Sequence, residues 1–208
     1  MPLFLRYLLA VCIGYLLGCS NMAFYIARSR GLDIRRAGTG NPGASNAMLL
    51  LGWKVGILVA LHDIGKAALA VWLCSLLFPA LPLVRETAGL ACVLGHLFPF
   101  YLRFHGGKGF ASSLGMIAAL NWRFALALGL AIVVLVLITD YIVVGTVTTV
   151  VSYPVYCLIT SQFIAAILLT LVALIILYKH RENFVRILNG TEVGLRKAHR
   201  GDLRVDKS

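Results

Sequence analysis

A short basic, glycine-rich segment in this apolar chain has the residue types of an anion-binding site. It reads His105, Gly106, Gly107, Lys108 and Gly109. Glycines let the backbone approach a ligand closely, and free N–H groups at the start of a following helix bind anions. The segment lacks the GxxxxGK[ST] spacing of a Walker A motif. A simple basic turn at a membrane face is the alternative interpretation.

A second glycine-rich segment lies earlier in the chain. It reads Gly38, Thr39, Gly40, Asn41, Pro42, Gly43, Ala44, Ser45 and Asn46. Its backbone amides can converge on an oxyanion, and its hydroxyl and amide side chains add hydrogen-bond donors. Arg35 and Arg36 directly upstream favour an anion site. The alternative is a turn that enters a helix, with Ser45 or Asn46 as its cap.

A third polar cluster follows the last apolar stretch and starts with Lys179, His180, Arg181, Glu182 and Asn183. His180 and Asn183 have the i,i+3 spacing that places two side chains on one helix face. A histidine, with an ordinary pKa of roughly 6.5, can serve as base, acid or neutral donor. A basic cluster at a membrane edge is the alternative.

Four further ionisable residues fall inside apolar stretches. Asp63 and Lys66, with His62 beside them, have i,i+3 spacing. Ionisable groups inside a membrane are costly and usually pair with each other or line a site. We therefore expect a structural salt bridge first and a substrate contact by Lys66 second. For His96, a helix-contact role is preferred over a site role.

Several motifs are absent, and their absence narrows the chemistry. The chain has no GxSxG elbow, no HExxH helix and no cluster of carboxylates, so we expect no metal and no cofactor. Five cysteines lie in apolar segments without paired metal spacing, which indicates neither zinc nor disulfides. The chain also lacks the HxxxxD pair of acyltransferases that use CoA or a carrier protein.

The elements that carry these motifs must be membrane helices. Of the 208 residues, 60% are hydrophobic and 13% are charged, and the mean hydropathy is +0.90, which excludes an ordinary soluble domain. A membrane-crossing helix needs about 20 apolar residues. The stretches that approach this length are 3–27, 52–79, 86–104, 124–139 and 155–178.

Lysine and arginine gather in three regions, near 28–36, 103–108 and 179–207. Cytoplasmic loops are enriched in these residues, so all three regions are expected on the cytoplasmic side. This topology also explains most of the net charge of +11, and we expect no nucleic-acid partner.

Even numbers of crossings must separate these three regions. Polar breaks near 121–123, at Asp140 and at 161–162 favour four short spans at 110–121, 124–139, 141–159 and 162–178. The expected fold is therefore an all-α polytopic membrane bundle with seven transmembrane helices, or five as the alternative. The N terminus is expected outside and the C terminus in the cytoplasm.

The domain organisation is expected to be simple. Residues 1–192 form one membrane-embedded domain with cytoplasmic motif loops near 28–50, 103–112 and 179–192. Residues 193–208 form a basic cytoplasmic tail near anionic lipid headgroups.

Taken in order, four motifs closely resemble one enzyme family. They are GTGNPGASN at 38–46, DIGK at 63–66, GHLFPFYLRFHGGKGFASSLG at 95–115 and KHRENFVRILNGTE at 179–192. They resemble the bacterial acyl-phosphate-dependent glycerol-3-phosphate acyltransferases, the PlsY family, over nearly the whole chain. The resemblance implies acyl transfer from acyl phosphate to the 1-hydroxyl of glycerol 3-phosphate. The products would be lysophosphatidic acid and phosphate, in the first acylation of phospholipid synthesis.

The resemblance also implies roles for residues. His180 and Asn183 match essential positions of the family, and the loop around Lys108 matches its glycerol-phosphate loop. The expected catalytic residues are His180, Asn183, Thr39 and Lys108. The expected substrate-binding residues are Gly38, Gly40, Asn41, Gly43, Ser45, Asn46, Gly106, Gly107, Gly109, Arg35, Arg36 and Lys66. Either His180 or a substrate phosphate would serve as the base.

The implied setting is the bacterial plasma membrane, with the active site facing the cytoplasm. The implied partners are acyl phosphate, glycerol 3-phosphate, membrane lipid and an enzyme that produces acyl phosphate. A small transporter of an organic phosphate or other anion is the alternative function.

The chain departs from the family pattern at two notable positions. Thr39 stands where the family usually has serine, so a hydroxyl is kept. Leu49 aligns with a common family arginine, so Arg35, Arg36 or Lys54 must supply its charge unless the charge is dispensable.

Overall fold

The computed structural model describes residues 1–196, and these residues form helices joined by loops, with no β-strand among them. The α-helices are α1 (Leu3–Cys19), α2 (Met22–Ser29), α3 (Ala44–Leu51), α4 (Trp53–Leu77), α5 (Val84–Leu97), α6 (Phe110–Leu120), α7 (Trp122–Thr139), α8 (Ile142–Ile159), α9 (Phe163–Lys179) and α10 (Arg181–Leu188). A short 3-10 turn, η1 (Phe100–Leu102), follows α5. The expected all-α class is confirmed.

Four helical segments are long and apolar enough to cross a membrane, namely Leu3–Ser29, Trp53–Leu77, Trp122–Thr139 and Ile142–Ile159. A fifth is obtained when α9 and α10, which meet at a bend of 50°, are taken together. By length, α5 and α6 have only 14 and 11 residues. The chain is thus a multi-span membrane protein.

The apolar stretches predicted from sequence have different ends in the structure. The stretch 86–104 was predicted as one span, but α5 ends at Leu97, because Pro99 and η1 turn the chain away. The stretch 155–178 is divided by a turn between Ile159 and Phe163, as the polar residues there suggest. Within 3–27, the side chain of Asn21 accepts a hydrogen bond from Phe24 N–H at 2.8 Å and starts α2.

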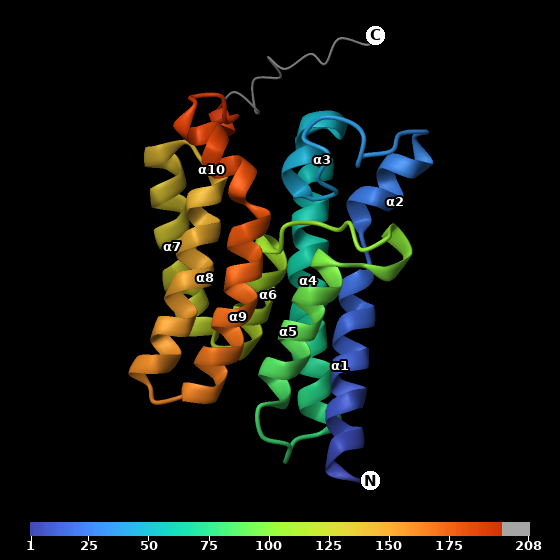
Figure 1. The fold of residues 1–208 in the computed structure, drawn as a ribbon, viewed down its shortest axis with the longest axis vertical. Helices are drawn as coiled ribbons and strands as arrows, with labels where there is room; N and C mark the ends of the chain where they lie inside the picture. Colours follow the sequence, from blue (N-terminus) through green and yellow to red (C-terminus); the bar gives the residue numbers. More distant parts are fainter. Residues whose placement is uncertain (197–208) are drawn as a thin grey trace.

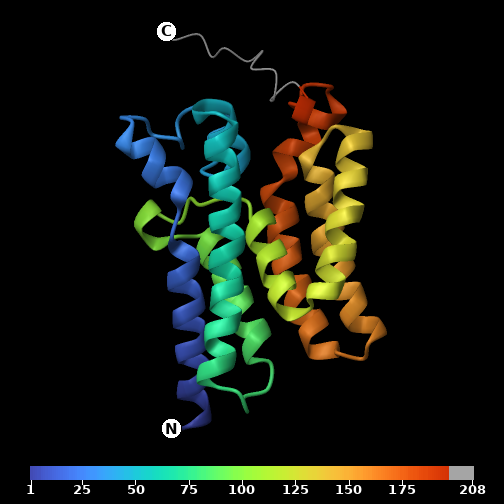
Figure 2. The same cartoon turned by 180° about the vertical axis from the view of Figure 1, so that it is seen from behind.

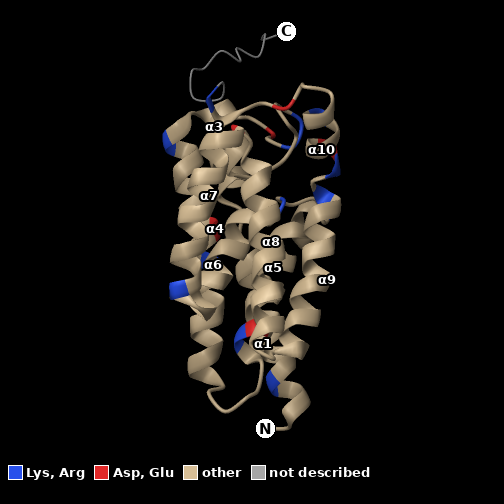
Figure 3. Cartoon of the chain, turned by 90° about the vertical axis from the view of Figure 1, so that its left-hand side faces the viewer, with Lys and Arg blue, Asp and Glu red and all other residues tan. Residues whose placement is uncertain are grey.

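The helices form two groups, with α1 to α5 on one side and α7 to α10 on the other, and α6 lies between them (Figures 1 and 2). The loop between α2 and α3, α3 itself and α10 lie at the end of the bundle opposite the N terminus (Figure 1). Charged residues also concentrate at that end (Figure 3). Two of the three motif segments therefore lie at one end of the apolar bundle, while the loop before α6 lies lower, nearer the middle of the bundle (Figure 1).

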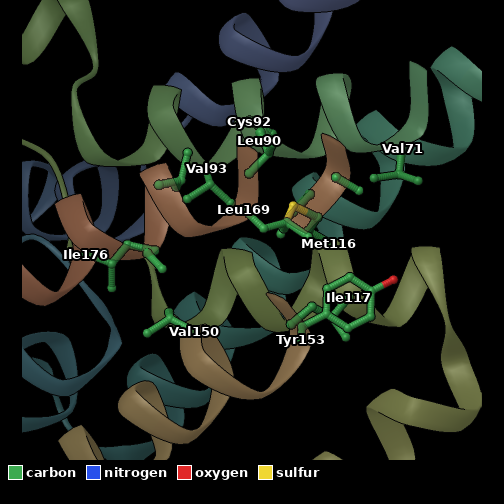
Figure 4. Close-up of a cluster of buried hydrophobic side chains, with 14 of the residues drawn as sticks. Val71, Leu90, Cys92, Val93, Met116, Ile117, Val150, Tyr153, Leu169 and Ile176 are labelled. Carbon is green, nitrogen blue, oxygen red and sulfur yellow. The ribbon is translucent and has the colours of Figure 1, made fainter. Parts of the chain in front are cut away.

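Apolar side chains from both groups meet in a common core, which Figure 4 shows in close-up. Its members include Val71, Leu90, Cys92, Val93, Met116, Ile117, Val150, Tyr153, Leu169 and Ile176. They come from α4, α5, α6, α8 and α9. This core fixes α6 against both groups and thereby positions the loop before α6.

Glycines let α1 and α5 pack at very short range. A Cβ atom on Gly18 would lie 2.0 Å from the carbonyl oxygen of Cys92, and one on Gly14 would lie 2.3 Å from that of Ala88. From α5, a Cβ on Gly95 would lie 2.2 Å from the carbonyl oxygen of Tyr15. Small residues at such crossings are a common device of membrane helix pairs.

We expect Gly18→Ala to lower the thermal unfolding midpoint of the detergent-solubilised protein. The added methyl group must push α1 away from α5, and such overpacking costs about 1 to 3 kcal/mol. Gly129→Ala in α7 is the matched control, because nothing lies within 4 Å of a Cβ atom there. Equal midpoints for the two variants would contradict the close packing of α1 on α5.

Candidate active site

A cavity of about 150 Å³ is lined by residues from all three predicted motif loops. The predicted site residues that line it are Thr39, Asn41, Gly43, Ser45, Lys108, Gly109, His180 and Asn183. The four predicted catalytic residues are thus brought together. The predicted residues that do not line it are Gly38, Gly40, Asn46, Gly106, Gly107, Arg35, Arg36 and Lys66.

One wall of the cavity is the N-terminus of α6. The N-cap residue Gly109 has φ 92° and provides no side-chain cap. The first-turn N–H groups of a helix have no partner within the helix, and here Phe110 and Ala111 line the cavity together with Gly109. This end of α6 therefore offers free donors and a positive helix dipole to an anion.

The two preceding glycines hold the loop against α5. Gly106 N–H donates to Leu97 O and Gly107 N–H donates to His96 O, each at 3.1 Å. A Cβ atom on Gly106 would lie 2.1 Å from His96 O. In this conformation the amides of Gly106 and Gly107 are already used, so the free amides lie in the first turn of α6.

A second wall is the N-terminus of α3. Its N-cap residue, Gly43, also lacks a side-chain cap bond. Gly43, Ala44 and Ser45 line the cavity. Two helix N-termini thus border the same cavity, and each of them favours a negatively charged ligand.

Asn46 shapes the loop that leads into α3. Its Nδ2 group donates to Ile34 O and to Ala37 O, both at 3.0 Å, and its Oδ1 accepts from Thr39 N–H at 2.9 Å. The residue is fully buried, and Gly38, with φ 59°, has no room for a Cβ atom beside it. Asn46 and Gly38 therefore fix the backbone at Thr39, which lines the cavity.

The two arginines before this loop face elsewhere. Arg35 makes a two-point contact with Asp33, with Nε to Oδ1 at 3.0 Å and Nη2 to Oδ2 at 2.9 Å. This hydrogen bonding lowers the pKa of Asp33 to about 2. Arg36 is largely exposed, with Nε 3.9 Å from Asp33 Oδ2. Their role here is to order the loop rather than to line the cavity.

A chain of polar contacts crosses the cavity between the loop before α6 and α10. Lys108 Nζ donates to Asn183 Oδ1, and Asn183 Nδ2 donates to Glu192 Oε1 at 2.6 Å. Arg186 Nε donates to Glu192 Oε2 at 2.6 Å. Burial lowers the pKa of the Lys108 ammonium, and its proximity to Arg186 adds to this. An anion that replaced Asn183 beside Lys108 would stabilise the ammonium group and so raise its pKa again.

Sequence interpretation missed Arg186 and Glu192, which both line the cavity. The signal was available, because His180, Asn183 and Arg186 continue one i,i+3 series. Leu49 also lines the cavity, whereas Arg35, Arg36 and Lys54 do not. Among the described residues, Arg186 is the arginine that lines the same cavity as Leu49.

His180 sits at the joint between α9 and α10 and is only 5% exposed. Its Nδ1 atom lies 2.9 Å from Ile176 O. A carbonyl oxygen can only accept, so the proton resides on Nδ1 and the lone pair on Nε2. A neutral ring, with Nε2 free to accept a proton, fits this buried position.

The remaining walls are mostly apolar. Met48 and Leu49 of α3, Phe110 of α6, and Ile142 and Val143 of α8 line the cavity. Val193 and Leu195 add to it from the chain after α10. Leu195 N–H donates to Asp140 O at 2.9 Å, which fixes this segment over the α7–α8 junction. The site thus extends past residue 192, and the rest of the predicted tail, 197–208, lies outside the described residues.

The fold and the site thus define an integral-membrane protein whose cavity combines basic side chains, two free helix N-termini and apolar walls. Residues 8–190 match the family described as glycerol-3-phosphate acyltransferase. The chain belongs to this glycerol-3-phosphate acyltransferase family, as its motifs predict, and is an acyltransferase.

Relatives and solved structures agree with this assignment. The chain is 36% identical to glycerol-3-phosphate acyltransferase 1 of Oceanobacillus iheyensis, over 91% of this chain and 95% of the relative. It is 38% identical to the enzyme of Shouchella clausii, over 91% and 96%. The crystal structure of PlsY in its glycerol 3-phosphate form superposes with a TM-score of 0.84 at 32% identity, covering 91% of this chain and 95% of that one. The lysophosphatidic acid form gives 0.81 at 31% identity, covering 93% and 97%.

Proposed function

We propose that the cavity transfers a fatty acyl group from acyl phosphate to the 1-hydroxyl of glycerol 3-phosphate. The products are lysophosphatidic acid and inorganic phosphate. The observation that carries this proposal is the meeting of two uncapped helix N-termini, those of α3 and α6, beside Lys108 and His180. Both substrates carry a phosphate, and each N-terminus is suited to one.

The position of Lys108 is the basis on which we place the two phosphates in the cavity. The glycerol 3-phosphate group binds at the first turn of α6, where Lys108 and Arg186 supply positive charge. The acyl phosphate group binds at the first turn of α3, beside Thr39, Asn41 and Ser45. The acyl chain leaves the cavity along the apolar side chains of α3 and α8, toward the lipid.

The free Nε2 of His180 makes this residue the proton acceptor in our mechanism. The hydroxyl oxygen of glycerol 3-phosphate attacks the acyl carbon as its proton passes to Nε2. The bond between the acyl carbon and the phosphate oxygen then breaks, and the phosphate leaves with the electron pair and takes up the proton from Nε2, which restores the neutral His180. Thr39, Asn41 and the amides of α3 stabilise the oxyanion that forms in between. Acyl phosphate is a mixed anhydride, so no protein nucleophile is needed.

We also propose seven crossings with the motif end in the cytoplasm of a bacterial cell. The crossings are α1 with α2, and then α4, α5, α6, α7, α8 and α9 in turn. Arg28, Arg30, Arg35 and Arg36 before α3 and Lys108 before α6 support this orientation through the positive-inside rule. With 14 and 11 residues, α5 and α6 are too short to cross alone, but neighbouring helices cover them.

The reaction places this protein after an enzyme that makes acyl phosphate. Such an enzyme is its proposed functional partner, and the membrane receives the lysophosphatidic acid. We propose that residues up to 196 complete the membrane domain, since Val193 and Leu195 contribute to the cavity.

The test uses the purified, detergent-solubilised protein with palmitoyl phosphate and glycerol 3-phosphate, in the presence of a chelator and without CoA. We expect equal amounts of lysophosphatidic acid and phosphate. Palmitoyl-CoA in place of palmitoyl phosphate should give no product. Absence of lysophosphatidic acid, together with uptake of phosphate esters into proteoliposomes, would favour the transporter alternative.

A further inference from the structure

A cluster of buried ionisable residues lies directly behind the glycine loop. It comprises Asp63 and Lys66 of α4 and His96 of α5, which are 3%, 6% and 3% exposed. The mechanism above uses none of them. Asp63 and His96 nevertheless line the cavity, so the cluster borders it directly.

The hydrogen bonds of Lys66 determine the protonation of this cluster. Lys66 Nζ lies 2.7 Å from Ser20 O, 2.8 Å from Asp63 Oδ1 and 2.9 Å from His96 Nδ1. An ammonium group has three protons and no acceptor capacity. Asp63 Oδ1 also lies 3.3 Å from His96 Nδ1, but Lys66 is nearer and can only donate, so its three protons meet three acceptors when Nδ1 accepts. The ring is then neutral and carries its own proton on Nε2.

The Nε2 edge of His96 faces the glycine loop. A Cβ atom on Gly107 would lie 2.1 Å from Nε2, so Gly107 packs against this edge and no larger residue fits there. Within residues 1–196 the Nε2–H group has no hydrogen-bond acceptor. Nε2 is also not among the buried side-chain atoms that lack a partner, so it is open to the cavity, where a ligand can supply the acceptor.

We propose that His96 is a further substrate-binding residue, whose Nε2–H donates to a phosphate oxygen held at the N-terminus of α6. The proposal rests on the proposed function. Lys66 acts through His96 as a positioning residue, because its donation to Nδ1 places the proton on Nε2. The opposite charges of Asp63 and Lys66 cancel, so the cluster contributes a directed donor while Lys108 contributes the charge.

The primary test replaces His96 with two amides whose side chains differ in length. His96→Asn keeps a polar atom near the Nδ1 position for Lys66 but has none at the Nε2 position. His96→Gln places an amide donor near the Nε2 position. We expect His96→Asn to reduce kcat/KM by about 10- to 100-fold with an unchanged unfolding midpoint, as for loss of a hydrogen bond to a charged group. We expect His96→Gln to recover part of that loss.

Separate KM measurements identify the phosphate involved. We expect a rise in KM for glycerol 3-phosphate alone, because that phosphate is placed at the first turn of α6, and a rise for palmitoyl phosphate alone would overturn this contact. His62→Asn is the matched control, because His62 also approaches Asp63, with Nδ1 at 3.5 Å from Oδ1, but does not line the cavity. We expect its kinetics to stay within about twofold of the wild type, as for substitutions that leave the site intact.

A measurement on the unaltered protein keeps the proposal testable if a variant does not fold. The ¹⁵N NMR spectrum of histidine-labelled protein should show His96 with an unprotonated Nδ1 and a protonated Nε2. The reverse tautomer, or wild-type kinetics of His96→Asn with both substrates, would overturn the proposal. Either result would leave the proposed function intact if the wild-type protein still makes lysophosphatidic acid.

Discussion

Replacing Lys108 with alanine is expected to lower kcat/KM for glycerol 3-phosphate by about 100- to 1000-fold, the loss typical of removing one preorganised donor from an acyl-transfer site. Lys108 combines a charge, burial and a place next to the free amides of α6, and Arg186 alone cannot replace it. The loss should appear in initial rates of lysophosphatidic acid formation across a range of glycerol 3-phosphate concentrations.

Lys54→Ala is the control for this loss. Lys54 is exposed beside Trp53, with Nζ 5.8 Å from the ring centroid, and does not line the cavity. We expect its kinetics and unfolding midpoint to match those of the wild type. If Lys108→Ala stays folded and retains wild-type rates, the glycerol-phosphate site does not lie at α6.

Replacing His180 with alanine is expected to lower kcat by about 100- to 10,000-fold, the usual contribution of a positioned general base. The hydrogen bond to Ile176 O directs the lone pair of Nε2 away from α9, and no second histidine from α9 or α10 is present. The KM values should change far less than kcat. Single-turnover formation of lysophosphatidic acid measures this loss most directly.

His105→Ala is the matched control, since His105 is exposed and does not line the cavity. We expect wild-type kcat for this variant. If His180→Ala loses less than about tenfold in kcat while remaining folded, a substrate phosphate rather than His180 accepts the proton.

Much of this site could be predicted from sequence because its parts lie in continuous motifs. Glycines, a lysine and an i,i+3 pair of His180 and Asn183 are local signals, and the cavity brings Thr39, Lys108, His180 and Asn183 together. Family membership followed from the same motifs in the same order.

The roles of individual glycines and arginines could not be predicted, because they depend on contacts between distant segments. Gly106 and Gly107 pack on His96, which is ten or more residues earlier in the chain. Arg35 pairs with Asp33 away from the cavity, whereas Arg186 lines the cavity and pairs with Glu192. Likewise, His96 looked like a packing residue because nothing local indicates that Lys66 contacts its Nδ1 atom.

The helix ends could also be predicted only where a local sequence signal marks them. Local breakers such as Pro99 and the polar turn after Ile159 are visible in the sequence. The short length of α6, with 11 residues, is tolerated only because α4, α5, α7 and α8 surround it. Hydropathy alone therefore identifies four or five spans by length and composition.

The most direct test of the account is a crystal structure with glycerol 3-phosphate and a non-hydrolysable acyl phosphonate bound together. We predict the glycerol phosphate group within hydrogen-bonding distance of Lys108 Nζ and the first turn of α6. The phosphonate should lie at the first turn of α3, with the 1-hydroxyl between the acyl carbon and His180 Nε2. Binding of both ligands away from this cavity would contradict the account.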